Sequence, residues 1–198
     1  ALSHPGFPQL LQYQSKQPAY LLTKLKDNPI MKPIVDHFWE SRAVFNPGAI
    51  YEQGRVHMIY RAIGDQDVSV LGYASSPDGT NFDVRLDEPA YVPRESFECS
   101  SPYSQGTAYS PYASGGGCFG GCEDPRLTKI DDTVYMTYVA YDGWSPPRVA
   151  LTSISVDDFV RHRWNWKKPV LISRPGQVNK NACLLPEKVD GKFVLYHR

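Results

Sequence analysis

The chain has 198 residues, enough for one domain with a sizeable hydrophobic core. Its 21 basic and 21 acidic residues cancel, and it has no basic tract or acidic tail, so we expect neither nucleic acid nor a membrane surface as a partner. No apolar run approaches the roughly 20 residues that a membrane-spanning helix needs. Tyr, Pro and Gly are plentiful and helical periodicity is sparse, which indicates an all-β fold.

Residues 1–43 form a lead-in that precedes the regular pattern of the rest of the chain. The first residues lack the basic and apolar regions of a signal peptide, so a cytoplasmic location is expected. Near the end of this segment, His37 and Trp39 could line a sugar subsite, although core packing is the favoured interpretation of both.

A frame of two short strands then recurs three times, at residues 46–60, 124–138 and 181–196. Each copy opens with an Asn or Asp, passes through a tight polar turn and ends at an aligned tyrosine. The first two copies share the same spacing, and the third has one extra residue. The turn residues and the β-branched and aromatic flanks predict a hairpin in each copy.

The first two copies share a third predicted strand, because Ala74 and Thr152 stand equally far beyond the aligned tyrosines. Repeats of about 40 to 60 residues built from short strands are typical of propeller blades. A β-sandwich of unrelated hairpins would not explain the polar residue that opens each copy. Since the innermost strands of a propeller converge on its axis, Asn46, Asp124 and Asn181 should face one central pocket.

The second copy begins with a charged cluster, Glu123-Asp124-Pro125-Arg126, at the start of an apolar hairpin. Charges that enter a buried strand are costly unless they are paired. The cluster is therefore either a structural ion pair or a functional site.

Six motifs, in this order along the chain, resemble those of glycoside hydrolase family 130. They are Asn46-Pro47-Gly48-Ala49, Tyr60-Arg61-Ala62, Glu123-Asp124-Pro125-Arg126, Pro147-Arg148-Val149-Ala150-Leu151, Lys180-Asn181, and Pro186-Glu187-Lys188 through His197-Arg198. The resemblance runs from about Asn46 to the last residue. It implies a five-bladed β-propeller that acts on β-mannosides, as an inverting phosphorylase or, in some branches, as a hydrolase.

The resemblance also implies a domain organisation. A partial propeller spans 44–198, with blade one at about 44–94, a loop at 96–121, blade two at about 122–175 and the start of blade three at 180–198. Family members would continue with roughly two more blades, so only about the first three are expected here. An open propeller exposes sheet edges, which is unfavourable. We therefore expect either that the chain is a fragment, or that the ring is completed by another copy of this chain or by a second chain.

The 96–121 loop is rich in Ser, Gly and Tyr and interrupts the repeat directly before the charged cluster. A loop of this length inside a compact domain is usually functional or disordered. Two interpretations stay open. One is a flap over the pocket, with Tyr103, Tyr109 and Tyr112 as platforms for sugar stacking, and the other is flexible filler.

The four cysteines, Cys99, Cys118, Cys122 and Cys183, give little functional information. Cys118 and Cys122 are close in sequence, but no second pair accompanies them, so no metal site and no cofactor are expected. Free thiols suit a reducing compartment, with a Cys118–Cys122 disulfide as the alternative.

For the reaction, the resemblance assigns Asp124 as the general acid. Inverting cleavage needs a carboxylic acid that protonates the departing oxygen and a nucleophile on the opposite face of the sugar. In a phosphorylase the nucleophile is inorganic phosphate, so cations replace the catalytic base. The candidates for phosphate binding are Arg148, Lys180, His197 and Arg198, whose other interpretation is ordinary solvated charge.

Sugar contacts are expected from the remaining polar motif residues, because hydroxyl groups donate to carboxylates and accept from guanidinium groups. An ordinary salt bridge at the rim is the other interpretation of the Arg61 group, and Glu123 and Arg126 are also expected to orient Asp124. The candidates for substrate binding are Asn46, Arg61, Asp65, Glu123, Asn181 and Glu187.

Three functions follow as hypotheses. The first is an inverting phosphorylase that cleaves β-mannosides, such as manno-oligosaccharides or mannosyl-glucose, with inorganic phosphate as co-substrate to give mannose 1-phosphate. The second is a β-mannoside hydrolase of the same fold, such as a β-1,2-mannosidase, which would need a carboxylate base. The third is a carbohydrate-binding propeller without catalysis. Arg148, Lys180 and His197 together favour the first.

Overall fold

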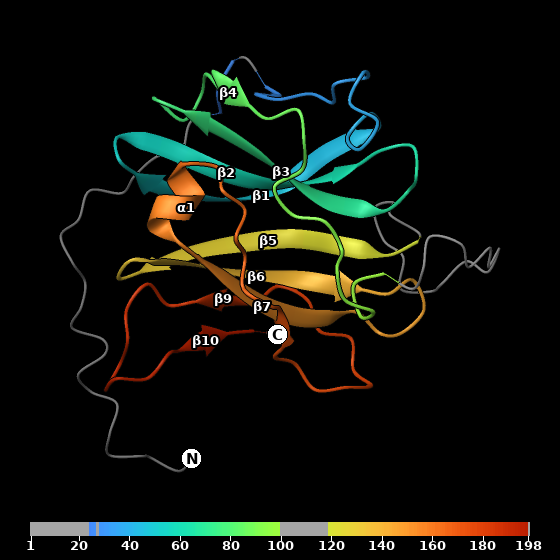
Figure 1. Ribbon diagram of the computed structural model, residues 1–198, viewed down its shortest axis with the longest axis vertical. Helices are drawn as coiled ribbons and strands as arrows, with labels where there is room; N and C mark the ends of the chain where they lie inside the picture. The colour runs from blue at the N-terminus through green and yellow to red at the C-terminus, as the bar shows by residue number, and fades with distance from the viewer. Residues whose placement is uncertain (1–23, 27, 100–118, 198) are drawn as a thin grey trace, which may run out of the picture.

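The computed structural model describes residues 24–26, 28–99 and 119–197 (Figure 1). Strands dominate this part of the chain, with one short helix, and none of its helices is long and apolar enough to cross a membrane. The elements in chain order are β1 (Ala43–Glu52), β2 (Arg55–Ile63), β3 (Ser69–Ser76), β4 (Val84–Arg85), β5 (Gly121–Ile130), β6 (Thr133–Tyr141), β7 (Arg148–Ser155), α1 (Val156–Val160), β8 (Val170–Leu171), β9 (Cys183–Leu184) and β10 (Leu195–Tyr196).

The strands form three consecutive units, seen one below another in Figure 1. Unit one (β1–β4) and unit two (β5–β8) are antiparallel, and a single parallel bridge between Ser69 and Gly121 joins them into one sheet. Unit three is the β9–β10 pair. The all-β prediction is confirmed, and the three predicted hairpins are present as β1–β2, β5–β6 and β9–β10.

The turns of the first and third hairpins have the predicted chemistry. Gln53 and Gly54 have φ values of 46° and 78°, and Asp190 and Gly191 have values of 50° and 71°. Two successive left-handed residues give the turn that matches the twist of paired strands, and Asn, Asp and Gly residues favour it. These turns set the register of both strands that they connect.

The starts of the inner strands differ from the prediction. Asn46 and Asp124 were expected to open their strands, but β1 begins at Ala43 and β5 begins at Gly121. Both residues lie instead where the ladder is irregular, between Phe45 and Gly48 in β1 and between Glu123 and Arg126 in β5. The prolines that follow them have no N–H to donate, so regular pairing cannot continue and the chain bulges.

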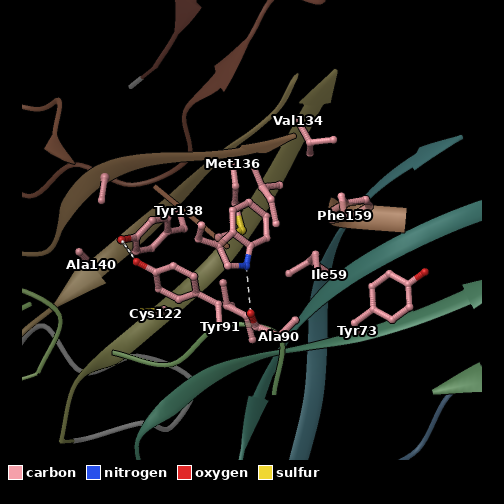
Figure 2. Close-up of a cluster of buried hydrophobic side chains, with 14 of the residues drawn as sticks. Ile59, Tyr73, Ala90, Tyr91, Cys122, Val134, Met136, Tyr138, Ala140 and Phe159 are labelled. Atoms are coloured by element: carbon pink, nitrogen blue, oxygen red, sulfur yellow. Dashed lines mark hydrogen bonds between the residues drawn. The ribbon is translucent and has the colours of Figure 1, made fainter. Parts of the chain in front are cut away.

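The main hydrophobic core lies between units one and two (Figure 2). Ile59 and Tyr73 come from unit one, Met136 and Tyr138 come from unit two, and Phe159 of α1 is fully buried beside them. The indole of Trp166 belongs to the same cluster and donates to the Ala90 carbonyl over 3.0 Å. Burial of this apolar surface holds the two units face to face. The members of the cluster are Ile59, Leu71, Tyr73, Ala90, Tyr91, Cys122, Val134, Met136, Tyr138, Ala140, Ala150, Ile154, Val156, Phe159 and Trp166.

A second cluster lies apart from this core and includes Trp39 of the lead-in with Met58 and Tyr60 of β2. Trp39 is buried there, which confirms that it packs in a core. Beside it, the buried carboxylate of Glu40 accepts from the Tyr60 hydroxyl over 2.9 Å and from Arg85 over 2.5 Å. His37 lies 2.7 Å from the same carboxylate, so an ion-paired network fastens the lead-in to unit one.

Unit three packs on unit two through hydrogen bonds as well as apolar contact. Thr137 of β6 donates to the Ala182 carbonyl over 2.5 Å, and Thr128 of β5 donates to the Leu184 carbonyl over 3.1 Å. Both threonines are buried, so these donors satisfy backbone oxygens that would otherwise lose their hydration.

Units one and two also approach closely at Gly48, where the backbones of β1 and β5 touch. A Cβ atom at Gly48 would lie 2.6 Å from the Pro125 carbonyl oxygen and 3.1 Å from the Arg126 Cα. Both neighbours are backbone atoms, which cannot move aside as a flexible side chain could. This contact brings the bulges at Asn46 and Asp124 together.

Replacement of Gly48 by alanine tests this contact. We expect Gly48→Ala to lower the free energy of unfolding by about 2 kcal/mol, the scale of overpacking a tight interior, as measured by urea denaturation. Ala49→Ser, a change at the exposed neighbour, should stay within about 0.5 kcal/mol of the parent. Equal stability of the Gly48→Ala protein and its parent would show that the two strands are not in contact.

Candidate active site

The site is built around Arg61, whose side chain is 2% exposed near the end of β2. Its Nη2 donates to Glu123 Oε1 over 2.9 Å, and its Nη1 lies 3.4 Å from Asp124 Oδ1. Nε donates to the Ser69 hydroxyl over 3.0 Å, and the guanidinium lies over the Phe45 ring, 4.8 Å from its centroid. A buried guanidinium held on all sides has a fixed direction, so it presents its charge to both carboxylates.

Glu123 is the buried carboxylate of the pair, with its side chain 1% exposed. Besides Arg61, it contacts Lys180, whose Nζ lies 3.2 Å from Oε2. Burial raises the pKa of Glu123 above its ordinary value, and the charges of Arg61 and Lys180 act against that shift. Glu123 thus joins a cation from unit one to a cation that directly precedes unit three.

Asp124 differs from its neighbour because its side chain is 14% exposed. Its Oδ1 accepts from Asn46 Nδ2 over 2.8 Å and faces Arg61 Nη1. Both of these donors engage the same oxygen, which leaves Oδ2 as the oxygen able to reach a bound molecule. Of two consecutive carboxylates, one is therefore sealed in an ion network and the other stands at the surface of the site.

Asn46, Asp124 and Asn181 share one backbone conformation, with φ values of 49°, 50° and 61°. Only a few non-glycine residues take this left-handed conformation readily, Asn and Asp foremost. Asn46 contacts Asp124 directly, and Asn181 follows Lys180, which contacts Glu123. The structure thus places Asn46 directly beside Asp124 and, among the described residues, links Asn181 to them only through its neighbour Lys180.

A hollow of about 310 Å³ lies next to Asn181, between units two and three. Arg126, Tyr196 and His197 line it. Arg126 was expected to orient Asp124, but its Nη1 donates to the Pro125 carbonyl over 2.9 Å, so its described hydrogen bond is to the backbone. His197 therefore lies near Arg126 and Asn181 rather than among the contacts of Glu123 and Asp124.

Arg148 lies at a third location, at the first residue of β7. It is opposite Ala140, which is itself opposite Cys122, so two strand spacings, or roughly 10 Å, separate it from Cys122 on β5. Its Nη2 donates to the Ser173 carbonyl, while its Nε is buried without a hydrogen-bond partner among the described residues. It lines a hollow of about 350 Å³ with Asp142.

The remaining candidates are not brought into the cluster in the described part of the chain. Asp65 is exposed after β2 and accepts from the Ser41 hydroxyl over 2.7 Å. Glu187 is exposed between β9 and β10. Arg198, Cys118 and the three tyrosines of the loop, Tyr103, Tyr109 and Tyr112, lie outside the described residues. Cys122 is a buried free cysteine.

Sequence reasoning missed Ser69 and Phe45, which hold the guanidinium of Arg61. Ser69 is the first residue of β3, and no motif marks it. Phe45 directly precedes Asn46, so a search for an aromatic residue beside each repeat start could have found it. Within the described ranges, no three His, Cys, Asp or Glu side chains are placed to hold a metal ion.

The burial of Glu123 predicts a pH-dependent stability effect of Lys180→Met. Because the pKa of Glu123 is raised in the fold, its contribution to stability is fully present below the ordinary pKa of about 4.3 and is lost as pH rises through the folded value. Removal of a cation raises this pKa further. The loss of unfolding free energy should therefore be small near pH 4 and reach about 2 kcal/mol near pH 8, in denaturant titrations at both pH values.

Lys188→Met is the matched control, since Lys188 Nζ also lies 3.2 Å from a carboxylate oxygen, that of Asp131. Both of those side chains are exposed, so this loss should stay below about 0.5 kcal/mol at either pH. If the two variants lose equal stability and show the same pH dependence, Lys180 does not compensate a buried charge.

Comparison of the chain with known proteins shows its family. A profile of glycoside hydrolase family 130, described as beta-1,4-mannooligosaccharide phosphorylase, matches residues 21–198. A beta-1,2-mannobiose phosphorylase from Thermoanaerobacter sp. (strain X514) is 36% identical over 198 residues, which cover 90% of this chain and 55% of the relative. A 1,2-beta-oligomannan phosphorylase from the same strain is 37% identical over 187 residues, which cover 89% and 53%.

Among solved structures, a glycosyl hydrolase from Bacteroides ovatus matches with a TM-score of 0.62 at 24% identity, over 87% of this chain and 52% of that one. This likeness shows the all-β fold. The chain spans about half the length of the curated relatives that it matches. The match over residues 21–198 establishes that the chain belongs to glycoside hydrolase family 130.

Proposed function

We propose that the protein is an inverting β-mannoside phosphorylase that uses inorganic phosphate to release mannose 1-phosphate. Two relatives at 36% and 37% identity bear the names of phosphorylases of β-1,2-linked mannosides, which supports this reaction and makes β-1,2-mannobiose the first substrate to test. The observation that carries the proposal is the arrangement at β5, where a surface carboxyl at Asp124 stands beside a buried, ion-paired Glu123.

The architecture proposed for this reaction is a five-bladed β-propeller in which units one, two and three are consecutive blades. Three observations support it: the repeated hairpins, the left-handed residue at the three equivalent repeat positions, and a core that lies between units one and two. In such a fold the inner strands surround a central pocket, where Asp124 would meet the sugar.

Asp124 acts as the general acid in this proposal. Proton transfer from Oδ2 to the glycosidic oxygen leaves a carboxylate, whose negative charge develops as the bond to the leaving group breaks. Arg61 and Asn46 both donate toward Oδ1, so they stabilise this carboxylate without competing for the oxygen that carries the proton. Their contacts also fix the direction of the carboxyl group.

Glu123, the carboxylate next to Asp124, is poorly placed to act as the base that a hydrolase needs. A hydrolase needs a second carboxylate that activates water from the opposite face of the sugar. Glu123 is the nearest carboxylate to Asp124 in sequence, but it is sealed from solvent and engaged by Arg61 and Lys180. Its geometry suits a structural anion rather than a base that must reach water.

The phosphate-binding candidates lie at three separate locations, so a single phosphate would be held at one of them rather than by all. Among these candidates, Lys180 contacts Glu123, the neighbour of the acid, and its side chain is 18% exposed. Arg148 has a buried Nε without a described partner, which is costly unless a ligand or water satisfies it. His197, next to Arg126, is the third candidate.

The test of the function is the dependence of sugar release on phosphate. We expect the protein to convert β-1,2-mannobiose to mannose and mannose 1-phosphate only when phosphate is present, as detected by chromatography of the products. Release of mannose without phosphate would identify a hydrolase, and binding of the sugar with no products would identify a carbohydrate-binding propeller.

Asp124→Asn tests the acid directly, because the amide keeps the size of the side chain but has no proton to give. We expect turnover of β-1,2-mannobiose to fall about a hundredfold or more with substrate binding retained, measured as kcat and KM at saturating phosphate. The loss should be smaller for an aryl mannoside with a good leaving group, since such a group needs less protonation. Parental turnover of the mannobiose in the variant would place the acid elsewhere.

A further inference from the structure

A second buried carboxylate, Glu98, lies in the connection that follows unit one. Its side chain is fully buried and has four donors. Oε1 accepts from the hydroxyls of Tyr91, over 2.8 Å, and of Tyr138. Oε2 accepts from the backbone N–H groups of Arg94 and Glu95 over 2.7 and 2.8 Å. No glycan chemistry described above uses this residue, although it is as buried as Glu123.

The backbone of Glu98 connects this network to the acid site. Its carbonyl accepts from the N–H of Gly121 over 2.7 Å. Gly121 is the first residue of β5 and forms the parallel bridge to Ser69, whose hydroxyl accepts from Arg61. Three steps, through Gly121 and Ser69, therefore connect Glu98 to the guanidinium that faces Asp124.

Gly121 itself lies against the backbone of Ser69 in a conformation that requires glycine. Its φ of 121° is a conformation that other residues rarely adopt, and a Cβ atom there would lie 2.2 Å from the Ser69 carbonyl oxygen. Glu123 and Asp124 follow within three residues on the same strand. The placement of Gly121 therefore determines where β5 presents both carboxylates.

We infer that Glu98 is a positioning residue for Asp124: its four accepted hydrogen bonds hold residues 94–98 in place, and its own backbone carbonyl in turn holds the first residue of β5. This inference rests on the proposed function, in which Asp124 is the acid. The hydroxyls come from both units, Tyr91 beside unit one and Tyr138 from β6, and lie 3.0 Å apart (Figure 2). Glu98 thus holds the two units in register at the point where β5 begins.

A carboxylate suits this position better than an amide. It offers acceptors on both oxygens, and all four groups around it are donors. Glu98→Gln keeps the shape but turns an N–H₂ group toward either the two hydroxyls or the two backbone N–H groups. In the second case two donors face two donors, and in the first the hydroxyls must rotate and give up their bonds to Oε1.

The kinetic test compares Glu98→Gln with Glu95→Gln, a change three residues away whose side chain faces Lys168 at 3.7 Å. We expect Glu98→Gln to lower kcat for β-1,2-mannobiose about tenfold or more with little change in KM, because a displaced acid costs transition-state alignment rather than binding. The loss should largely disappear with an activated aryl mannoside. A purely structural defect would lower kcat for both substrates alike. The control variant Glu95→Gln should have the kinetic constants of the parent.

Hydrogen–deuterium exchange tests the same inference without activity. In Glu98→Gln, a peptide that covers residues 120–126 should exchange about tenfold faster than in the parent, while a peptide from the β1–β2 turn should not change. Tyr138→Phe removes one hydroxyl and should give a smaller change in the same direction if Glu98→Gln folds poorly. Parental exchange at residues 120–126 in both variants would overturn the inference. If the parent has no activity on mannosides, the proposed function is contradicted. The exchange result would still decide whether Glu98 holds residues 120–126 in place.

Discussion

The structure depends on the burial of one negative charge. Glu123 can remain sealed from water only if cations replace its hydration, and it draws one from β2 and another from the residue before Asn181. Three units that are distant in sequence must therefore meet at a single side chain. Apolar packing brings units one and two face to face, but the hydrophobic effect is non-directional, whereas a hydrogen-bonded ion pair fixes the direction of its groups.

This constraint explains how two consecutive carboxyl groups come to differ. The backbone turns out of the regular ladder at Asp124, so that residue is released from the interior that encloses Glu123. The same guanidinium then serves both, with one nitrogen on each. The buried Glu123 keeps Arg61 in place, and Arg61 keeps the direction of the partly exposed Asp124 carboxyl group. Glu123 thus has a structural role and Asp124 the proposed chemical role, and both carboxyl groups contact Arg61.

Much of this arrangement could be predicted from the sequence, because repeats reveal themselves by spacing. The hairpins, the meeting of Asn46 with Asp124 and the nearness of Lys180 all follow from the aligned frame. The bulges could not be predicted from spacing alone, since both copies carry the same extra residue and align without a gap. The position of Arg148, two strands away from β5, could not be predicted either, because a motif records order along the chain and not position in space. Glu98 stands outside every repeat, so no alignment could mark it.

The left-handed backbone at the three repeat positions has a consequence for how such a site can arise. Asn, Asp and Gly take this conformation most readily, so the main chain disfavours a longer acid such as glutamate before its reach matters. Asn and Asp codons differ by one nucleotide. Duplication of a hairpin with Asn at this position therefore supplies a ready place for a carboxyl group, and a single mutation converts a passive copy into an acidic one without any rearrangement of the backbone.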